Sequence, residues 1–341
     1  LDQLYTGEIS APEQSDTYTF SVPAGATVYF DAQVGNSQMR WSVLDASGEA
    51  ILGSSRTDFD LGEFVFTEGG DYQLVINGTD NITDPASYEI YLWDVPDDAR
   101  FTAPISPAER ILDGEDDPYV VTGRIDTPGA TNRYSITLDD QSRLFLQSVM
   151  GTSQTRWSII DGDGNELAGT TRTDINLGIA NFPASGDYEI VVTGRDDGIG
   201  DYAFKVWDIP QEQSFDAQIT PADRTAQPVV STGEIATPGQ IAFYNFNVEA
   251  GQTVYFDSVS GSSQTRWALN DLNSVSLLGP TRTDIDLGEY TFADGGQYVV
   301  VVTGSTDGTG EFSFQLWDVP EVQTFDAQIT PADRTAQPVV S

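Results

Sequence analysis

The sequence contains no histidine and no cysteine, and its single lysine is Lys205. These absences exclude Ser-His-Asp and Cys-His catalytic machinery. They also exclude zinc, haem and iron–sulfur sites built on Cys and His ligands. Lack of cysteine rules out a disulfide scaffold but leaves the cellular compartment open, since exported proteins without cysteine are common.

Basic residues are scarce. The 341 residues include 53 acidic and 15 basic side chains, which give a net charge of −38. Phosphate binding requires a basic surface, so we do not expect nucleic acid as a partner. The charge favours solubility and divalent-cation binding, and it suits salty surroundings.

Long apolar runs are missing as well, so we expect no membrane insertion, and no signal peptide is recognisable. The chain begins with Leu1 rather than Met, so we expect a processed chain or an excerpt, which leaves room for an export signal that has been removed. Apolar residues make up 39% and aromatic residues 11% of the chain. This composition is sufficient for packed cores, and the length fits two or three domains.

An internal repeat organises the chain. Three motifs recur in the same order: Ser-Gln-Xaa-Arg-Trp, Arg-Thr-Asp and Trp-Asp-Val/Ile-Pro. They occur at Ser37–Trp41, Ser153–Trp157 and Ser263–Trp267, then at Arg56–Asp58, Arg172–Asp174 and Arg282–Asp284, and finally at Trp93, Trp207 and Trp317. The first unit is the longest, with extra residues in the turn at 77–87 and in the connector that follows residue 94. That turn contains glycosylation sequons at Asn77 and Asn81, which plain turn chemistry explains equally well.

The repeats predict three modules, at residues 1–98, 121–211 and 229–321, joined by connectors at 99–120 and 212–228. A further connector or strand is expected at 322–341. The segment Phe215–Ser231 is repeated letter for letter at Phe325–Ser341. Because the first copy leads directly into the next module, we expect the second copy to lead into a further module or a neighbouring subunit.

Short runs of alternating apolar and polar residues, separated by turn residues, predict strands. In the third unit they predict eight strands, at Val229–Ile235, Ile241–Val248, Thr253–Ser260, Thr265–Asn270, Val275–Leu278, Leu287–Phe292, Gln297–Thr303 and Glu311–Trp317. No segment shows a sustained helical period. We therefore predict an all-β protein with three tandem antiparallel β-sandwich modules of jelly-roll or related topology.

Several turn and core residues carry a resemblance to a known family. In the third unit they are Gly233, Tyr244, Ala250-Gly251, Val254–Phe256 and Gly296–Tyr298, and the first unit matches at Gly7, Asp16–Phe20, Ala24-Gly25, Val28–Phe30, Asp45–Gly48 and Gly70–Tyr72. The second unit departs from the pattern with Asp140-Gln141 in place of Ala-Gly. This order resembles the bacterial pre-peptidase C-terminal domain. The resemblance implies a β-sandwich in an extracellular setting, with an accessory, adhesive or substrate-contacting role and no catalysis of its own.

The Arg-Trp pair of each unit is the first candidate site. A tryptophan beside a guanidinium can stack on a sugar or bind a partner. The alternative is a core tryptophan whose neighbouring arginine lies on the opposite face of the strand. An aspartate of the Arg-Thr-Asp motif would then pair with an arginine across two strands as a structural staple. The candidate staple residues are Arg40, Trp41, Asp58, Arg156, Trp157, Asp174, Arg266, Trp267 and Asp284.

Calcium is the second candidate. Asp161, Asp163 and Asn165 place side-chain oxygens at alternate positions of a turn, as calcium loops do, and Asp196, Asp197 and Asp201 form another acidic group. A hairpin turn explains the Asp-Gly pattern equally well. Apart from calcium we expect no cofactor.

The repeat itself argues against an enzyme, because an active site seldom occurs three times in one chain. We expect a non-catalytic structural protein of a surface filament, stalk, sheath or adhesin, with copies of itself as partner in a head-to-tail polymer or in a longer repeat array. Strand addition by the C-terminal segment, including Pro338, Val339 and Val340, would occur beside Leu4, Tyr5 and Ile9 of the next chain. The alternative is a carbohydrate-binding or substrate-binding module of a secreted enzyme, with surface glycans as ligands.

Overall fold

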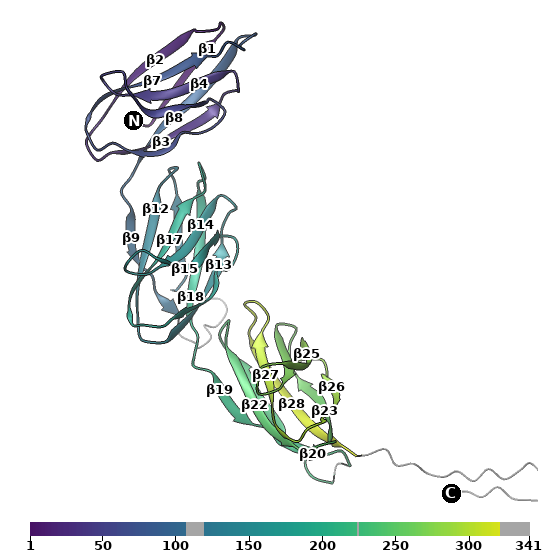
Figure 1. The fold of residues 1–341 in the computed structure, drawn as a ribbon. Coiled ribbons are helices and arrows are strands. Elements are labelled where there is room, and N and C mark those ends of the chain that lie inside the picture. Colours follow the sequence, from purple (N-terminus) through teal and green to yellow (C-terminus); the bar gives the residue numbers. More distant parts are fainter. Residues whose placement is uncertain (107–118, 224, 321–341) are drawn as a thin grey trace, which may run out of the picture. The chain divides into compact units, whose positions relative to one another are not determined.

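The computed structural model describes residues 1–106, 119–223 and 225–320, and these residues form strands and turns only (Figure 1). The strands of module 1 are β1 (Gln3–Ile9), β2 (Ser15–Val22), β3 (Thr27–Val34), β4 (Met39–Leu44), β5 (Ala50–Arg56), β6 (Gly62–Val65), β7 (Gly70–Gly78) and β8 (Ala86–Val95). Those of module 2 are β11 (Val121–Ile125), β12 (Thr131–Leu138), β13 (Ser142–Met150), β14 (Thr155–Ile160), β15 (Glu166–Arg172), β16 (Gly178–Phe182), β17 (Gly186–Gly194) and β18 (Gly200–Asp208). Those of module 3 are β21 (Val230–Ile235), β22 (Ile241–Val248), β23 (Thr253–Ser260), β24 (Thr265–Asn270), β25 (Ser276–Arg282), β26 (Gly288–Thr291), β27 (Gly296–Gly304) and β28 (Gly310–Val319).

Each module is a sandwich of two sheets. In module 1 the strand orders are β1-β8-β3-β6 and β2-β7-β4-β5, and all pairs are antiparallel. The corresponding strands of the other two modules pair in the same orders. Successive strands therefore alternate between the two sheets, except for β4 and β5, which are neighbours in one sheet, and this is the order of a jelly roll. The predicted all-β fold class is confirmed, and seven of the eight strand positions predicted in the third unit agree with the structure within about three residues, while β25 runs four residues further than predicted.

The apolar residues predicted to face inward fill three separate cores, one between each pair of sheets. Alternation is clear in β4, β14 and β24, where every second residue is buried. The chain divides into two compact units, Leu1–Ile209 with modules 1 and 2, and a second unit that begins at Pro210 and contains module 3.

A glycine at the start of each module allows a close aromatic approach. A Cβ built on Gly7 would lie 2.2 Å from the hydroxyl of Tyr88, and one on Gly123 would lie 2.4 Å from the hydroxyl of Tyr202. Larger residues would therefore displace a buried tyrosine from the core.

The connectors contain strands that the sequence did not predict. They are β9 (Ala99–Thr102), β10 (Ile105–Ser106), β19 (Gln213–Asp216) and β20 (Ile219–Pro221). Strand β9 pairs in parallel with β12, and β19 pairs in parallel with β22, so each adds a fifth strand to one sheet of the module that follows it (Figure 1). Strands β10 and β20 pair in parallel with β18 and β28 of the opposite sheets. These strands are only two to four residues long, too short to show a clear alternation, which is why the sequence pattern missed them.

Candidate functional site

The three tryptophans of the Arg-Trp pairs are core residues. Trp41, Trp157 and Trp267 are at most 1% exposed, and the indole Nε1 of Trp267 donates a hydrogen bond to the carbonyl of Ile285 at 3.0 Å. Trp157 makes the same bond to Ile175 at 3.1 Å. Fully enclosed rings have no face available to stack on a sugar, so the indoles contribute to packing rather than recognition.

The neighbouring arginines lie on the other strand face, as alternation predicts. Arg266 Nη1 donates hydrogen bonds to the carbonyls of Ser263 at 2.7 Å and Thr265 at 3.0 Å, and Arg40 and Arg156 repeat the pattern. The guanidinium therefore secures the loop that precedes its own strand.

The predicted staple across two strands has a different form. Asp174 accepts hydrogen bonds from Arg172 at 2.8 and 2.6 Å, two residues away in the same turn, and Asp58 and Asp284 likewise pair with Arg56 and Arg282. The arginine two residues before each aspartate reaches it with little loss of side-chain freedom. The arginines that were predicted to pair with these aspartates, Arg40, Arg156 and Arg266, donate hydrogen bonds to backbone carbonyls instead. Hydrogen bonding from the arginine lowers the pKa of Asp174.

The threonine between this arginine and aspartate is the part of the motif that the sequence reasoning missed. Thr283 is 4% exposed. Its hydroxyl accepts a hydrogen bond from the backbone N–H of Ser262 at 3.0 Å and lies 2.5 Å from the hydroxyl of Thr265. Thr57 and Thr173 occupy the same place in the other modules. The signal available in the sequence was a threonine that all three repeats share between the arginine and the aspartate.

The candidate calcium turn is closed by its own side chain. Asp161 Oδ1 accepts hydrogen bonds from the backbone N–H groups of Asp163 at 3.0 Å and Asn165 at 2.8 Å. Asp45 and Asp271 accept equivalent bonds in the other modules, where the alternating oxygen pattern is lost. The side-chain amide of Asn165 also donates a hydrogen bond to Asp161 Oδ2 at 3.0 Å, and this bond lowers the pKa of Asp161 the most, followed by the bond from the backbone N–H of Asn165. An Asx turn therefore explains the aspartate of all three modules.

The second acidic group is dispersed. Asp201 accepts a hydrogen bond from Arg124 Nη1 at 3.0 Å, and Asp196 pairs with Arg195 at 3.3 Å. Asp197 instead lies with Asp31 and Asp60 of module 1, with one carboxylate oxygen of each within 4.8 Å of the others. Within the described ranges this is the only group of three or more acidic residues close enough to hold a metal ion.

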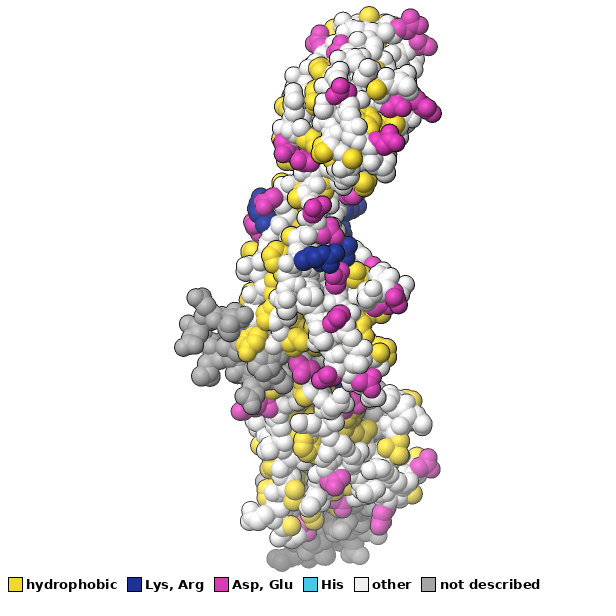
Figure 2. Space-filling model, turned by 90° about the vertical axis from the view of Figure 1, so that its left-hand side faces the viewer, with side chains coloured by type: hydrophobic (Ala, Val, Ile, Leu, Met, Phe, Trp, Pro, Cys, Tyr) yellow, Lys and Arg dark blue, Asp and Glu magenta, His cyan; other side chains and the backbone are white. Residues whose placement is uncertain are grey.

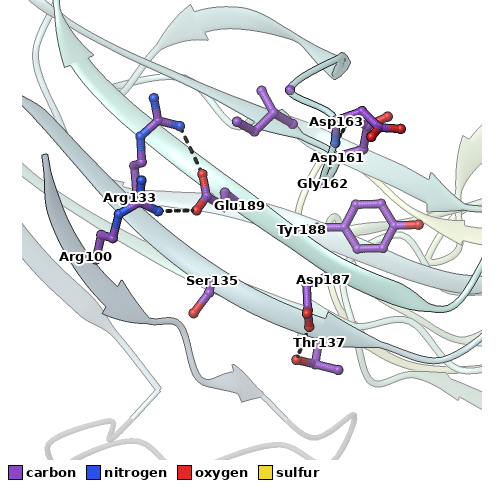
Figure 3. A pocket seen from close by; sticks show the side chains of 12 residues that line it. Arg100, Arg133, Ser135, Thr137, Asp161, Gly162, Asp163, Asp187, Tyr188 and Glu189 are labelled. Atoms are coloured by element: carbon purple, nitrogen blue, oxygen red, sulfur yellow. Dashed lines mark hydrogen bonds and ion pairs between the residues drawn. The ribbon is translucent and has the colours of Figure 1, made fainter.

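A polar groove of about 640 Å³ lies on module 2, between the Asp161 turn and strand β9. Arg100 of β9 and Arg133 of β12 donate hydrogen bonds to the two carboxylate oxygens of Glu189, at 2.8 and 2.9 Å (Figure 3). Asp187 accepts a hydrogen bond from the hydroxyl of Thr137 at 2.7 Å. The two ion pairs of Glu189 therefore link the connector strand β9 to the module.

Strands β9 and β19 each also carry an aromatic contact. Phe101 stacks on Tyr134 with ring centroids 5.0 Å apart, and Phe215 stacks on Tyr244 at 5.1 Å. The covered tyrosines are 3% and 2% exposed. Tyr18, the equivalent residue of module 1, is only partly buried, and β2 carries no fifth strand within the described ranges.

The end of module 1 that leads into module 2 forms a second contact region. Tyr29 donates a hydrogen bond to Asp60 at 3.0 Å, and Trp93 donates one to Asp31, also at 3.0 Å. The turn at Gly129 of module 2 packs against this end: a Cβ built there would lie 3.3 Å from Val95 and 3.5 Å from the ring of Tyr29.

The close approach of module 2 buries the acidic groups at this end of module 1. Burial raises the pKa of Asp60, and the neighbouring Asp31 and Asp197 raise it further, against the hydrogen bonds from Ala32 and Tyr29 that lower it.

We name the six residues of this region, Tyr29, Asp31, Asp60, Glu63, Trp93 and Val95, the end face. Module 3 has the same residue at every equivalent position, namely Tyr255, Asp257, Asp286, Glu289, Trp317 and Val319. The hydrogen bonds are repeated too, from Tyr255 to Asp286 at 2.7 Å and from Trp317 to Asp257 at 2.9 Å. Module 2 keeps the tryptophan, Trp207, but differs at the other five positions, with Phe145, Gln147, Asn176, Ile179 and Ile209.

The predicted assembly residues fall into two groups. Tyr5 and Ile9 are 7% and 0% exposed and belong to the core of module 1, whereas Leu4 is 43% exposed. Pro338, Val339 and Val340 lie outside the described residues. Strands β9 and β19 add to the strands equivalent to β2, whereas β10 and β20 add to the strands equivalent to β8, the partner of the β1 strand that contains Leu4.

The surface carries its negative charge in dispersed form. In Figure 2 acidic side chains are scattered over the visible face, while Lys and Arg side chains occur in one region only. On this face the acidic side chains are therefore not gathered into a single patch. Within the described ranges no helix has the length and hydropathy of a membrane span.

No protein-family model matches the chain, and no curated protein is similar to it in sequence. Solved structures offer distant likenesses. The chain is 16% identical to PliG, a periplasmic lysozyme inhibitor of Aeromonas hydrophila, over 32% of this chain and 99% of PliG, with a TM-score of 0.25. It is 13% identical to the CUB1-EGF-CUB2 region of human MASP-1/3, over 58% and 99% of the two chains, with a TM-score of 0.19. It is 10% identical to a triple jelly-roll protein of an archaeal virus turret, over 92% and 88%, with a TM-score of 0.18.

Proposed function

We propose that this protein is a non-catalytic structural repeat protein of the cell exterior, in which jelly-roll modules are joined in series as part of a surface filament, stalk, sheath or adhesin. The carrying observation is the connector strand: β9 and β19 each complete a sheet of the following module and cover its tyrosine with a phenylalanine. A connector that is part of the next fold transmits position and force from module to module, as a flexible tether does not.

The C-terminal segment extends this arrangement. Residues 325–341 lie outside the described residues, but their sequence is identical to 215–231, which supplies β19 and β20. We propose that they add in the same way to the strand of a further module that corresponds to β2, β12 and β22, with Phe325 over the equivalent tyrosine. The main-chain hydrogen bonds of such an addition give affinity, and the aromatic contact sets the register.

The distribution of aromatic residues supports a scaffold over the alternative of a carbohydrate-binding module. Stacking on sugars requires exposed rings on a common face. Here the tryptophans of the Arg-Trp pairs lie in the cores, and Tyr29 at the end of module 1 is packed against module 2. The resemblance to the pre-peptidase C-terminal domain and the absence of cysteine and histidine are compatible with an exported, non-catalytic protein.

Immunogold labelling of intact producing cells, with antibodies raised against the purified chain, tests the proposal. We expect gold on regular surface structures, and label confined to the cell interior would contradict an extracellular role. A glycan array probed with the same purified chain addresses the alternative. Dose-dependent binding to one class of glycan, lost at no cost in thermal stability when an exposed aromatic such as Phe59 is replaced by alanine, would favour a binding module instead.

A further inference from the structure

The end face of module 3 repeats a docking surface that module 1 uses within the same chain. All six residue types are shared, and so are the two side-chain hydrogen bonds that orient them. In module 1 this surface receives a turn of module 2. In module 3 it lines an open pocket of about 470 Å³.

Equivalent residues of the two end faces differ in how deeply they are buried. Tyr29 is 5% and Asp31 6% exposed, whereas Tyr255 and Asp257 are only partly buried. Asp60 is partly buried and Asp286 is exposed. Since residue types and hydrogen bonds are the same, the turn packed over module 1 accounts for the difference.

The turn that docks on module 1 has a defined chemistry. Thr127-Pro128-Gly129 places a glycine with a φ of 81° against the end face, and a Cβ there would also lie 3.1 Å from Glu63 Oε2. Glycine allows both the left-handed conformation and the close approach. A second turn places Asp197 of module 2 beside Asp31 and Asp60. Module 3 carries the same combination, Thr237-Pro238-Gly239 with a φ of 82° and an Asp-Gly turn at Asp307.

Module 1 lacks this chemistry at the equivalent turn. Its sequence there is Ala11-Pro12-Glu13, and Glu13 has a φ of 61°. A glutamate in this place would set its side chain against the end face and a second carboxylate beside Glu289, where like charges repel. Its other turn is longer, and Ile82 anchors it in the core of module 1 at 5% exposure. The first module of a second copy is therefore the poorer occupant.

We propose that the end face of module 3 is a docking surface for a further jelly-roll module that carries a Thr-Pro-Gly turn and an Asp-Gly turn, as modules 2 and 3 do. The inference rests on the proposed function, since it names the partner that the C-terminal connector leads to. The array then grows by modules of one turn type, and module 1 is distinguished from the others by its Glu13 turn.

An extended chain with a fourth module tests this proposal. Because 325–341 equals 215–231, residues 232–320 can be appended after Ser341 to create a fourth module behind an authentic connector. Carbodiimide labelling of carboxylates, read by mass spectrometry, reports coverage of the end face, and hydrogen exchange of residues 325–331 reports strand addition. In the 341-residue chain we expect Asp286 to label several-fold faster than Asp60.

In the extended chain, labelling of Asp286 should fall several-fold to the level of Asp60. The appended copy of Gly239 can be replaced by glutamate, the residue that module 1 has at this position. This change should restore fast labelling of Asp286. The matched control is glutamate at the appended copy of Gly251, which has the same φ of 82° and nothing within 4 Å of a Cβ, and it should leave labelling slow.

The outcomes separate the two proposals. Slow exchange of residues 325–331 with fast labelling of Asp286 would overturn the docking surface and leave strand addition standing. Fast exchange of 325–331 in the extended chain would overturn strand addition itself. If labelling of Asp286 in the 341-residue chain falls as its concentration rises, the occupant is a second copy, and the assignment to a Thr-Pro-Gly module is wrong.

Discussion

Phe215 lies over Tyr244 with ring centroids 5.1 Å apart and an interplanar angle of 26°, which fixes strand β19 on the edge of β22. The tyrosine hydroxyl donates a hydrogen bond to the carbonyl of Thr232 at 2.9 Å, and burial raises its pKa to about 12. One aromatic pair thus joins the connector, the second strand and the first strand of module 3. The same combination of Phe101 and Tyr134 occurs in module 2.

Phe215→Ala should release the connector strand without unfolding module 3. An aromatic pair contributes about 0.5–1.5 kcal/mol beyond its buried area. We therefore expect amide exchange of Gln213–Asp216 to accelerate about 10-fold or more. Asp216→Ala, an exposed change on the same strand, should leave exchange unchanged. Equal exchange in both variants would mean that the stacking does not hold the strand.

Trp267→Ala should destabilise module 3 strongly, because it removes a fully buried indole. Comparable truncations cost about 3–5 kcal/mol. Trp267→Phe keeps most of the volume but loses the hydrogen bond to Ile285, so a smaller loss of about 1–2 kcal/mol is expected. Chemical denaturation monitored by circular dichroism measures both. A stable, folded Trp267→Ala variant would contradict the core assignment and reopen a recognition role.

Substituting the arginines of the two motifs should have different effects on Tm. Arg266→Ala removes the guanidinium donor to the carbonyl of Ser263 and one of two donors to the carbonyl of Thr265, and it should lower Tm by a few degrees. Arg282→Ala removes a solvent-exposed pair with Asp284 and should change Tm by less than about 2 °C. A larger effect of Arg282→Ala than of Arg266→Ala would place the structural staple at the Arg-Thr-Asp turn after all.

Much of this architecture could be predicted from the sequence. Alternation between Tyr244, Phe246 and Val248 identified a strand and its buried face, because the side-chain period of a strand is independent of distant contacts. The burial of Trp267 followed from the same rule. The pairing of Asp284 did not, because alternation states which face a side chain occupies but not which of two nearby arginines reaches it.

The connector strands and the end face could not be predicted in the same way. Strand β19 forms because a neighbouring edge offers hydrogen bonds, and its own sequence carries no strand signal. Asp31 and Asp60 are far apart in the sequence and meet Asp197 only through the packing of two modules. The one available signal was the identity of six residues between the first and third units, at five of which the second unit differs.

Asp60→Asn should stabilise the protein at neutral pH. The pKa of Asp60 is raised, chiefly by burial, and Tyr29, Asp31 and Asp197 face it. The folded protein therefore binds a proton more tightly than the unfolded chain, so stability increases as pH falls and the charged form is the costly one above the folded pKa. Asn176 accepts the equivalent backbone hydrogen bond in module 2, at 2.8 Å, so asparagine fits structurally.

For this variant we expect a gain of about 1 kcal/mol or less at pH 7, since solvent screens a partly exposed carboxylate, and the gain should vanish as pH falls towards about 4. Asp58→Asn is the opposite control. The hydrogen bond from Arg56 lowers the pKa of Asp58, so the stability that charged Asp58 contributes to the folded protein is present at neutral pH and is lost in acid. Parallel pH profiles for the two variants would contradict this assignment.

Gly129→Glu should separate module 2 from the end face of module 1 while both modules remain folded. The substitution copies Glu13 of module 1 into a turn where a Cβ already approaches Val95 and the ring of Tyr29. Carbodiimide labelling of Asp60 should then rise several-fold, towards the rate of Asp286. Gly164→Glu is the matched control, because Gly164 has a φ of 83° and nothing within 4 Å of a Cβ. If both variants label Asp60 equally, the Gly129 turn does not cover the end face, and the argument for a docking surface on module 3 loses its precedent.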